Sequence, residues 1–197
     1  NLMYEAGADE EAISLLDNAF SQAGKSIDLH KIPHRGPQAS ILLLGATTIG
    51  AIFFAAFIKK LGDKAAEDTY PILKKGLIGI YNKYFGSNRH YRNIIISSSI
   101  DKSPETIYSL DFALYCKGKN EREKIKFLYE LEWTQEEFDR ATKEYLSAMV
   151  EYLSNDSGKI RELIDNSNSR IFPALIALNI ESQTLIKVNP FPEDVDI

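Results

Sequence analysis

An uncharged apolar run constrains this chain more than any other feature of its sequence. Residues Ile41 to Ile58 form 18 consecutive positions without Asp, Glu, Lys or Arg, and a run of about this length is the usual minimum for a membrane span. The run is too uniformly apolar for a helix at the protein surface. We therefore predict a helix over this run that is covered on all sides, either by protein or by lipid.

Small residues recur inside the run at helical spacing. Thr47, Ala51 and Ala55 lie four positions apart, and a stripe of small side chains lets another backbone approach closely. Lysines follow directly after the run. The predicted helix-packing or membrane-facing site therefore consists of Thr47, Ala51, Ala55, Lys59, Lys60 and Lys64.

Composition does not separate burial in protein from insertion in lipid, because both environments favour apolar side chains. Positive charge stands at both ends of the run, at Arg35 and at Lys59 and Lys60, and this gives no orientation bias across a membrane. A domain of this size also supplies enough apolar surface to cover one helix. Burial is the favoured interpretation, and docking on an anionic membrane is the alternative.

The segment before the run predicts a β-α-β unit. Leu2 to Glu5 fits a short strand, and Asp9 is a suitable N-cap for a helix. That helix buries apolar residues at helical spacing up to Phe20, and Gly24 ends it. A second strand around Leu29 ends at Pro33.

The segment after the run predicts an amphipathic helix over Asp63 to Phe85 that is kinked or split at Pro71. The pattern then changes to a period of two, which is typical of strands. Three strands are predicted as an antiparallel meander, over residues 93–100, 106–116 and 124–131.

The last third of the sequence predicts two helices and a hairpin. Thr134 and Glu137 match a capping box for a helix that runs to about Leu153. A short helix around Lys159 to Asp165 follows, and strands over 170–179 and 184–189 form a hairpin. We therefore predict an α+β fold with a β-α-β start, in which the central apolar helix and the amphipathic helix pack on a largely antiparallel sheet with a C-terminal hairpin.

Length and charge restrict the domain organisation and the partners. The 197 residues fit one domain, 1–197, with a subdomain seam near residue 88 that would divide 1–88 from 89–197. The net charge is −5, which argues against nucleic-acid binding because that needs a concentrated basic face. The single Cys116 and the lack of a signal-peptide pattern favour a cytoplasmic location, with membrane association as the alternative.

No combination of residues predicts a catalytic centre, a cofactor or a metal. His30 and His34 are separated by Pro33 and lack further ligands for zinc, and His90 stands among Arg and Tyr residues. Cys116 is interpreted as a packing residue, since no partner base is apparent. Phosphate-binding and nucleophile-elbow motifs are absent from the sequence. The strand carboxylates Asp111, Glu130 and Glu132 are predicted to face solvent.

The N-terminal third resembles a family of bacterial conflict systems. Gly7-Ala8-Asp9-Glu10-Glu11 at a helix start, a strand over Ser26 to Ile32 and an apolar segment ending at Lys59 and Lys60 are similar to the effector-associated constant component. The resemblance covers residues 2–62, and the chain departs from it in the spacing around 33–37 and in more than a hundred further residues. It implies a bacterial accessory or signalling module and carries no functional residues over.

These observations favour a non-enzymatic protein-interaction or accessory signalling module of a bacterial protein, whose partner is another protein or a second copy. The first alternative is a membrane-docked or membrane-perturbing effector that uses the apolar helix. The second is an enzyme whose site residues come together only in the folded chain.

Overall fold

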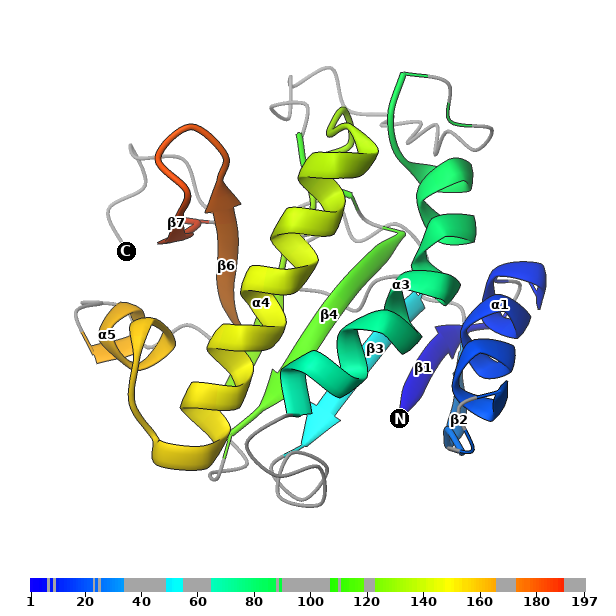
Figure 1. The fold of residues 1–197 in the computed structure, drawn as a ribbon, viewed down its shortest axis with the longest axis horizontal. Helices are drawn as coiled ribbons and strands as arrows, with labels where there is room; N and C mark the ends of the chain where they lie inside the picture. Colours follow the sequence, from blue (N-terminus) through cyan, green and yellow to red (C-terminus); the bar gives the residue numbers. More distant parts are fainter. Residues whose placement is uncertain are drawn as a thin grey trace.

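The computed structural model describes residues 1–6, 8, 10–22, 24, 26–33, 49–54, 65–87, 89, 107–109, 111–118, 123–165 and 173–189 (Figure 1). The helices and strands of these residues are β1 (Leu2–Glu5), α1 (Glu10–Gln22), β2 (Leu29–Ile32), β3 (Ile49–Phe54), α3 (Ala65–Tyr84), β4 (Phe112–Lys117), β5 (Lys124–Phe127), α4 (Gln135–Asn155), α5 (Lys159–Asp165), β6 (Ala174–Asn179) and β7 (Thr184–Lys187).

All of these strands belong to one seven-stranded sheet in the order β2-β1-β3-β4-β5-β6-β7. Antiparallel pairing joins β1 to β3, β4 to β5 and β6 to β7. Parallel pairing joins β1 to β2, β3 to β4 and β5 to β6, and each of these pairs is connected through at least one helix, as parallel strands require. The predicted α+β class, the β-α-β start and the C-terminal hairpin are confirmed.

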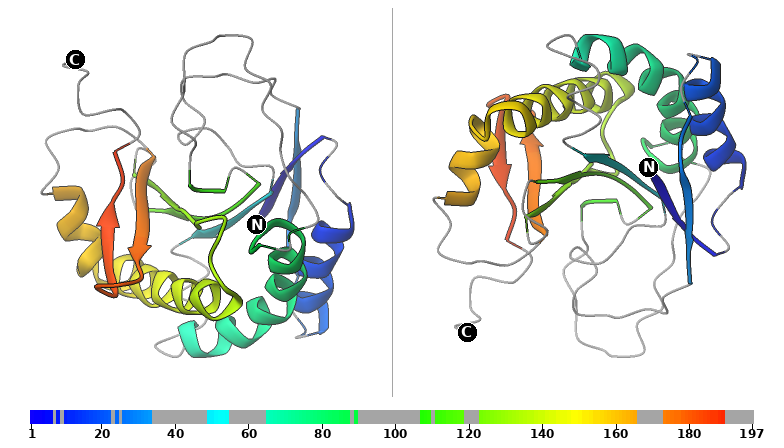
Figure 2. Two further views of the ribbon diagram at one scale, coloured as in Figure 1. Left: turned by 90° about the horizontal axis from the view of Figure 1, so that it is seen from above. Right: turned by 90° about the horizontal axis from the view of Figure 1, so that it is seen from below.

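Helices α1, α3 and α4 lie on the same face of the sheet (Figure 2). Alternate strand residues point toward them and form the main core, among them Leu2, Ile49, Phe112 and Phe127. The opposite face carries a smaller apolar cluster of Leu128, Leu175 and Ala177. Residues from both sides of position 88 contribute to the sheet and to the main core.

The helix predicted for the apolar run is wrong over Ile49–Phe54, which form strand β3. This strand lies between β1 and β4 in the interior of the sheet, and a strand buried on both faces is an almost continuous apolar sequence. Such a sequence has no period by which a buried strand differs from a buried helix. Residues 41–48 and 55–58 of the predicted helix lie outside the described residues. Within the part that the structure describes, no helix combines the length and apolar character needed to cross a membrane.

Two further elements differ in detail from the prediction. Helix α3 is continuous through Pro71 and is not split there. The strand predicted over 106–116 forms in two parts among the described residues: Tyr108 makes an antiparallel bridge with Glu130, and β4 begins at Phe112. Ahead of β4, the Ser109 hydroxyl accepts hydrogen bonds from the N–H groups of Asp111 and Phe112. The strand predicted over 93–100 lies outside the described residues.

Candidate functional site

The structure describes one residue of the predicted helix-packing site, Ala51, and this residue does not lie on a helix. Ala51 lies on β3, pairs with Leu2 and Leu114 and is buried in the main core. The other five residues, Thr47, Ala55, Lys59, Lys60 and Lys64, lie outside the described residues. Ala51 therefore packs against its neighbours in the sheet and does not belong to a stripe of small residues on a helix.

Histidines and cysteine do not assemble into a reactive centre among the described residues. His30 is exposed on β2, and His34 and His90 lie outside the described part. The described residues include no group of three or more His, Cys, Asp or Glu that is arranged to hold a metal ion. Cys116 is buried in the main core, where burial raises its thiol pKa; the thiol therefore stays protonated, as a packing residue would.

The strand carboxylates occupy three different environments. Glu132 is exposed and pairs with Arg89. Glu130 is half-buried, and its pKa is raised mainly by desolvation and also by the nearby Glu137. Asp111 is buried, so the prediction that it faces solvent is wrong. Its N–H donates to the Ser109 hydroxyl, and its carbonyl oxygen accepts from the N–H of Ile49 on β3, which holds this residue against the interior strand.

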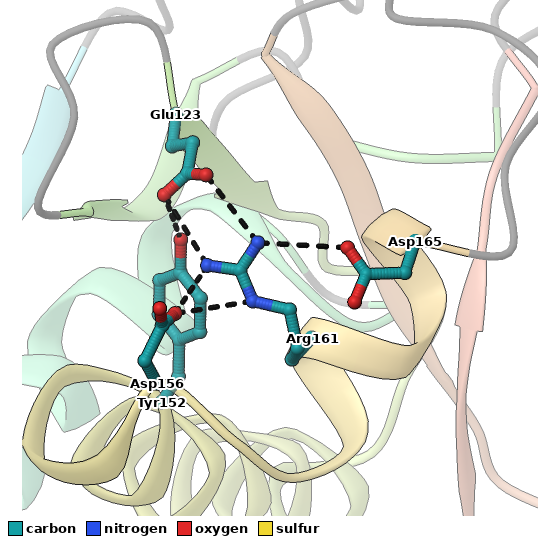
Figure 3. Close-up of polar contacts among 5 residues, drawn as sticks. All are labelled: Glu123, Tyr152, Asp156, Arg161 and Asp165. Carbon is teal, nitrogen blue, oxygen red and sulfur yellow. Dashed lines mark hydrogen bonds and ion pairs between the residues drawn. The ribbon is translucent and has the colours of Figure 1, made fainter.

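A polar network gathers around Arg161 at one end of the sheet (Figure 3). The guanidinium of Arg161 contacts carboxylates of three residues, which precede β5, cap α4 and end α5: Glu123, Asp156 and Asp165. The Tyr152 hydroxyl donates to Glu123 at 2.8 Å. The guanidinium also lies over the Tyr152 ring, 5.2 Å from its centroid.

This network holds secondary structure together and does not resemble an acid/base pair. Burial opposes the charge of Arg161, but the hydrogen bonds that its guanidinium donates to Asp156 and Glu123 outweigh burial and raise the Arg161 pKa. Burial and the hydrogen bond to Glu123 raise the Tyr152 pKa, so this hydroxyl keeps its proton near neutral pH. The charges on Arg161 and Glu123 satisfy one another, and we interpret the network as a clip between β5, α4 and α5.

Lys126 is a lysine in the interior of the protein. It lies on β5 and is 0% exposed, although it stands between the apolar residues Ile125 and Phe127 in the alternating pattern of the strand. Its ammonium group is 5.9 Å from the centroid of the Tyr115 ring, on the paired strand β4. Burial lowers its pKa to about 7. The alternation of apolar and charged residues along β5 does not predict this burial, because such a pattern does not reveal that the second face of the sheet is also covered.

The most accessible hydrogen-bonding surface of the described sheet is the outer edge of β2. This strand pairs with β1 alone in the described sheet, and Figure 2 shows it at the rim beside α1. Three of its four residues are exposed, and Leu29 retains 44% of its accessible surface. Edge strands of this kind are templates for pairing with another chain.

The ladder between β1 and β2 defines which backbone groups of β2 are directed toward a partner strand. The N–H of Leu2 donates to Asp28 and the N–H of Ala6 donates to Ile32. In a parallel ladder with this register, alternate residues of one strand face the partner strand. The N–H and C=O groups of Leu29 and Lys31 therefore point away from β1.

The opposite edge of the described sheet is less open. Strand β7 also has one strand neighbour, β6, but helix α5 packs against it. Leu185 of β7 is buried in the main core. The sequence predicted β2 as a strand ending at Pro33, but the order of strands, which makes β2 an edge, had no signal in the sequence.

No protein-family profile, curated protein or solved structure matches this chain.

Proposed function

We propose that this chain is a non-enzymatic protein-interaction module that adds a strand of a partner polypeptide to the outer edge of β2. The observation that carries the proposal is the exposed edge at Leu29–Ile32. In strand addition, backbone hydrogen bonds supply affinity and alternate side chains supply selectivity. The accessory role in a bacterial system rests on the resemblance of residues 2–62.

Two properties of β2 support this use. Leu29 and Lys31 direct both backbone polar groups outward, so a partner strand meets alternating donors and acceptors. The Leu29 side chain adds an exposed apolar contact. Pro33 follows the strand directly and has no N–H group to extend the edge, which limits the pairing surface to a short segment.

Selection from a displayed library of extended peptides tests the proposal. We expect bound peptides to protect the amide protons of Leu29 and Lys31 from exchange. Leu29→Pro removes the outward N–H without touching the bonds to β1, and we expect it to weaken the selected peptides about tenfold or more. Leu29→Ala keeps this N–H and serves as the matched control, with a smaller loss.

Two results would contradict the proposal. Selected peptides that bind folded Leu29→Pro as well as the unchanged chain would place the interaction elsewhere. Turnover of a compound in a metabolite panel, abolished by one substitution in a folded variant, would show that the chain is an enzyme.

A further inference from the structure

We propose that the strand added at β2 belongs to a second copy of this chain, in antiparallel orientation about a two-fold axis at Leu29. This inference rests on the proposed use of the β2 edge. The two-fold axis makes the contact isologous, so that the same short edge serves both partners and the assembly closes as a dimer.

The register follows from the groups that point outward. With the axis at Leu29, this residue lies opposite its own copy, and the two exchange N–H to O=C hydrogen bonds. Lys31 then lies opposite Ile27, two residues before β2, whose backbone groups face the partner copy where the added strand continues the extended pairing to this position. The exposed Leu29 side chains meet across the axis and shield one another from water.

Charge complementarity favours this register. It places Asp28 of each copy directly opposite His30 of the other, in a non-hydrogen-bonded pair, where side chains approach more closely. Asp28 and His30 are both exposed in the single chain. A carboxylate accepts a hydrogen bond from an imidazole N–H and attracts an imidazolium, and the symmetry provides this contact twice.

The neighbouring registers lack this match. An axis at His30 places the two His30 side chains against each other and Leu29 against Lys31. An axis at Lys31 places two ammonium groups opposite one another, which is destabilising, and it aligns Leu29 with Pro33, which lacks an N–H.

Sedimentation velocity over a concentration series tests the inference. We expect the unchanged chain to form dimers, and Leu29→Pro to weaken self-association about tenfold or more because outward donors are lost from both copies. Ile78→Ala removes an exposed apolar side chain from α3 and is the matched control that leaves the dimer intact. Circular dichroism establishes that each variant is folded.

A charge exchange tests the register itself. Asp28→Lys places an ammonium group opposite His30, and His30→Glu places a second carboxylate opposite Asp28, so we expect each variant alone to dimerise less than the unchanged chain. In an equimolar mixture of the two variants, one contact pairs the introduced ammonium with the introduced carboxylate, and the other pairs Asp28 with His30. We therefore expect the mixture to recover dimers.

The outcomes separate this inference from the proposed function. A chain that stays monomeric at its highest soluble concentration, or a dimer that folded Leu29→Pro leaves unchanged, overturns the two-fold pairing. Failure of the mixture to recover dimers overturns the register. Peptides that bind the unchanged chain but not folded Leu29→Pro would still support the interaction module when self-association is absent.

Discussion

The hydroxyl of Tyr145 donates a 2.6 Å hydrogen bond to the carbonyl oxygen of Leu128. The same hydroxyl accepts a 2.9 Å hydrogen bond from the N–H of Leu178. Because β5 and β6 are parallel and the N–H of Leu128 donates to Ile176, a regular ladder would next join Leu178 to Leu128 directly. The hydroxyl of Tyr145, a residue of α4, instead bridges these two backbone groups and connects the helix to both strands.

We expect Tyr145→Phe to lower the free energy of unfolding by about 2 to 4 kcal/mol, because a buried carbonyl and a buried N–H both lose their partner. Urea denaturation measures the change. Tyr4→Phe removes a hydroxyl from a half-buried ring, and we expect it to change stability by less than about 0.5 kcal/mol. An unchanged denaturation midpoint for Tyr145→Phe would show that the strands close the gap without cost.

Glycines set the distance between α1 and α3. A Cβ at Gly76 would stand 3.1 Å from the Leu16 Cα and 3.3 Å from the Leu15 carbonyl oxygen, which are backbone atoms. The three atoms nearest to a Cβ at Gly79 all belong to the Leu15 side chain, the closest at 2.2 Å. Ala is favoured over Gly in a helix by about 1 kcal/mol, but forced separation of packed elements costs about 1 to 3 kcal/mol.

We therefore expect Gly76→Ala to destabilise the chain by about 1 kcal/mol or more, since backbone atoms cannot rotate away from the added methyl group. Gly79→Ala is the matched control, because the half-buried Leu15 side chain can change rotamer. Thermal unfolding of both variants measures the difference. Equal effects of the two substitutions on stability would show that α1 and α3 can move apart without a measurable free-energy cost.

Local signals in the sequence predicted most helices of this fold. Thr134 forms the predicted capping box with Glu137, and Gly24 and Gly86 have the positive φ expected at helix ends. The hairpin of β6 and β7 could also be predicted from the sequence, because only four residues separate its strands. Each of these features depends on residues that are close in sequence.

Properties that depend on contacts between distant segments could not be predicted from the sequence. The apolar run predicted a helix because its length and lack of charge say nothing about the strands that flank Ile49–Phe54 on both sides. The burial of Lys126 depends on the second face of the sheet, and the clip at Arg161 depends on Glu123, 38 residues away. The open edge at β2 depends on the order of all seven strands.

The clip at Arg161 should contribute more to stability than an ion pair at the surface. The Arg161 and Glu123 side chains are 22% and 15% exposed, whereas Lys159 and Glu162 form a pair that is 49% and 62% exposed. We expect Arg161→Met to lower the free energy of unfolding by about 1 to 3 kcal/mol and Lys159→Met by less than about 0.5 kcal/mol. A double-mutant cycle with Glu123→Gln measures the coupling. A coupling energy near zero would show that the ion pair does not stabilise the fold.

Lys126 should make stability depend on pH in alkaline solution. Burial lowers its pKa to about 7 from 10.5, so between these values the unfolded chain holds a proton that the folded chain lacks. Stability contributed by this group therefore rises with pH through that window, by up to ~1.4 kcal/mol per pH unit, and is constant below it. We expect Lys126→Met to be more stable than the unchanged chain at pH 7, and the advantage to shrink as the pH approaches 10.5.

Chemical denaturation at a series of pH values measures the stability difference between each variant and the unchanged chain, which cancels the titration of other groups. Lys124→Met, at an exposed position two residues earlier on β5, is the control. It removes the same kind of side chain from a position in contact with water, so it reports what loss of a lysine from this strand does without the burial of Lys126. A stability difference for Lys126→Met that does not change between pH 7 and 10.5 would mean that the folded protein keeps Lys126 protonated, with the nearby Tyr115 ring compensating for its burial.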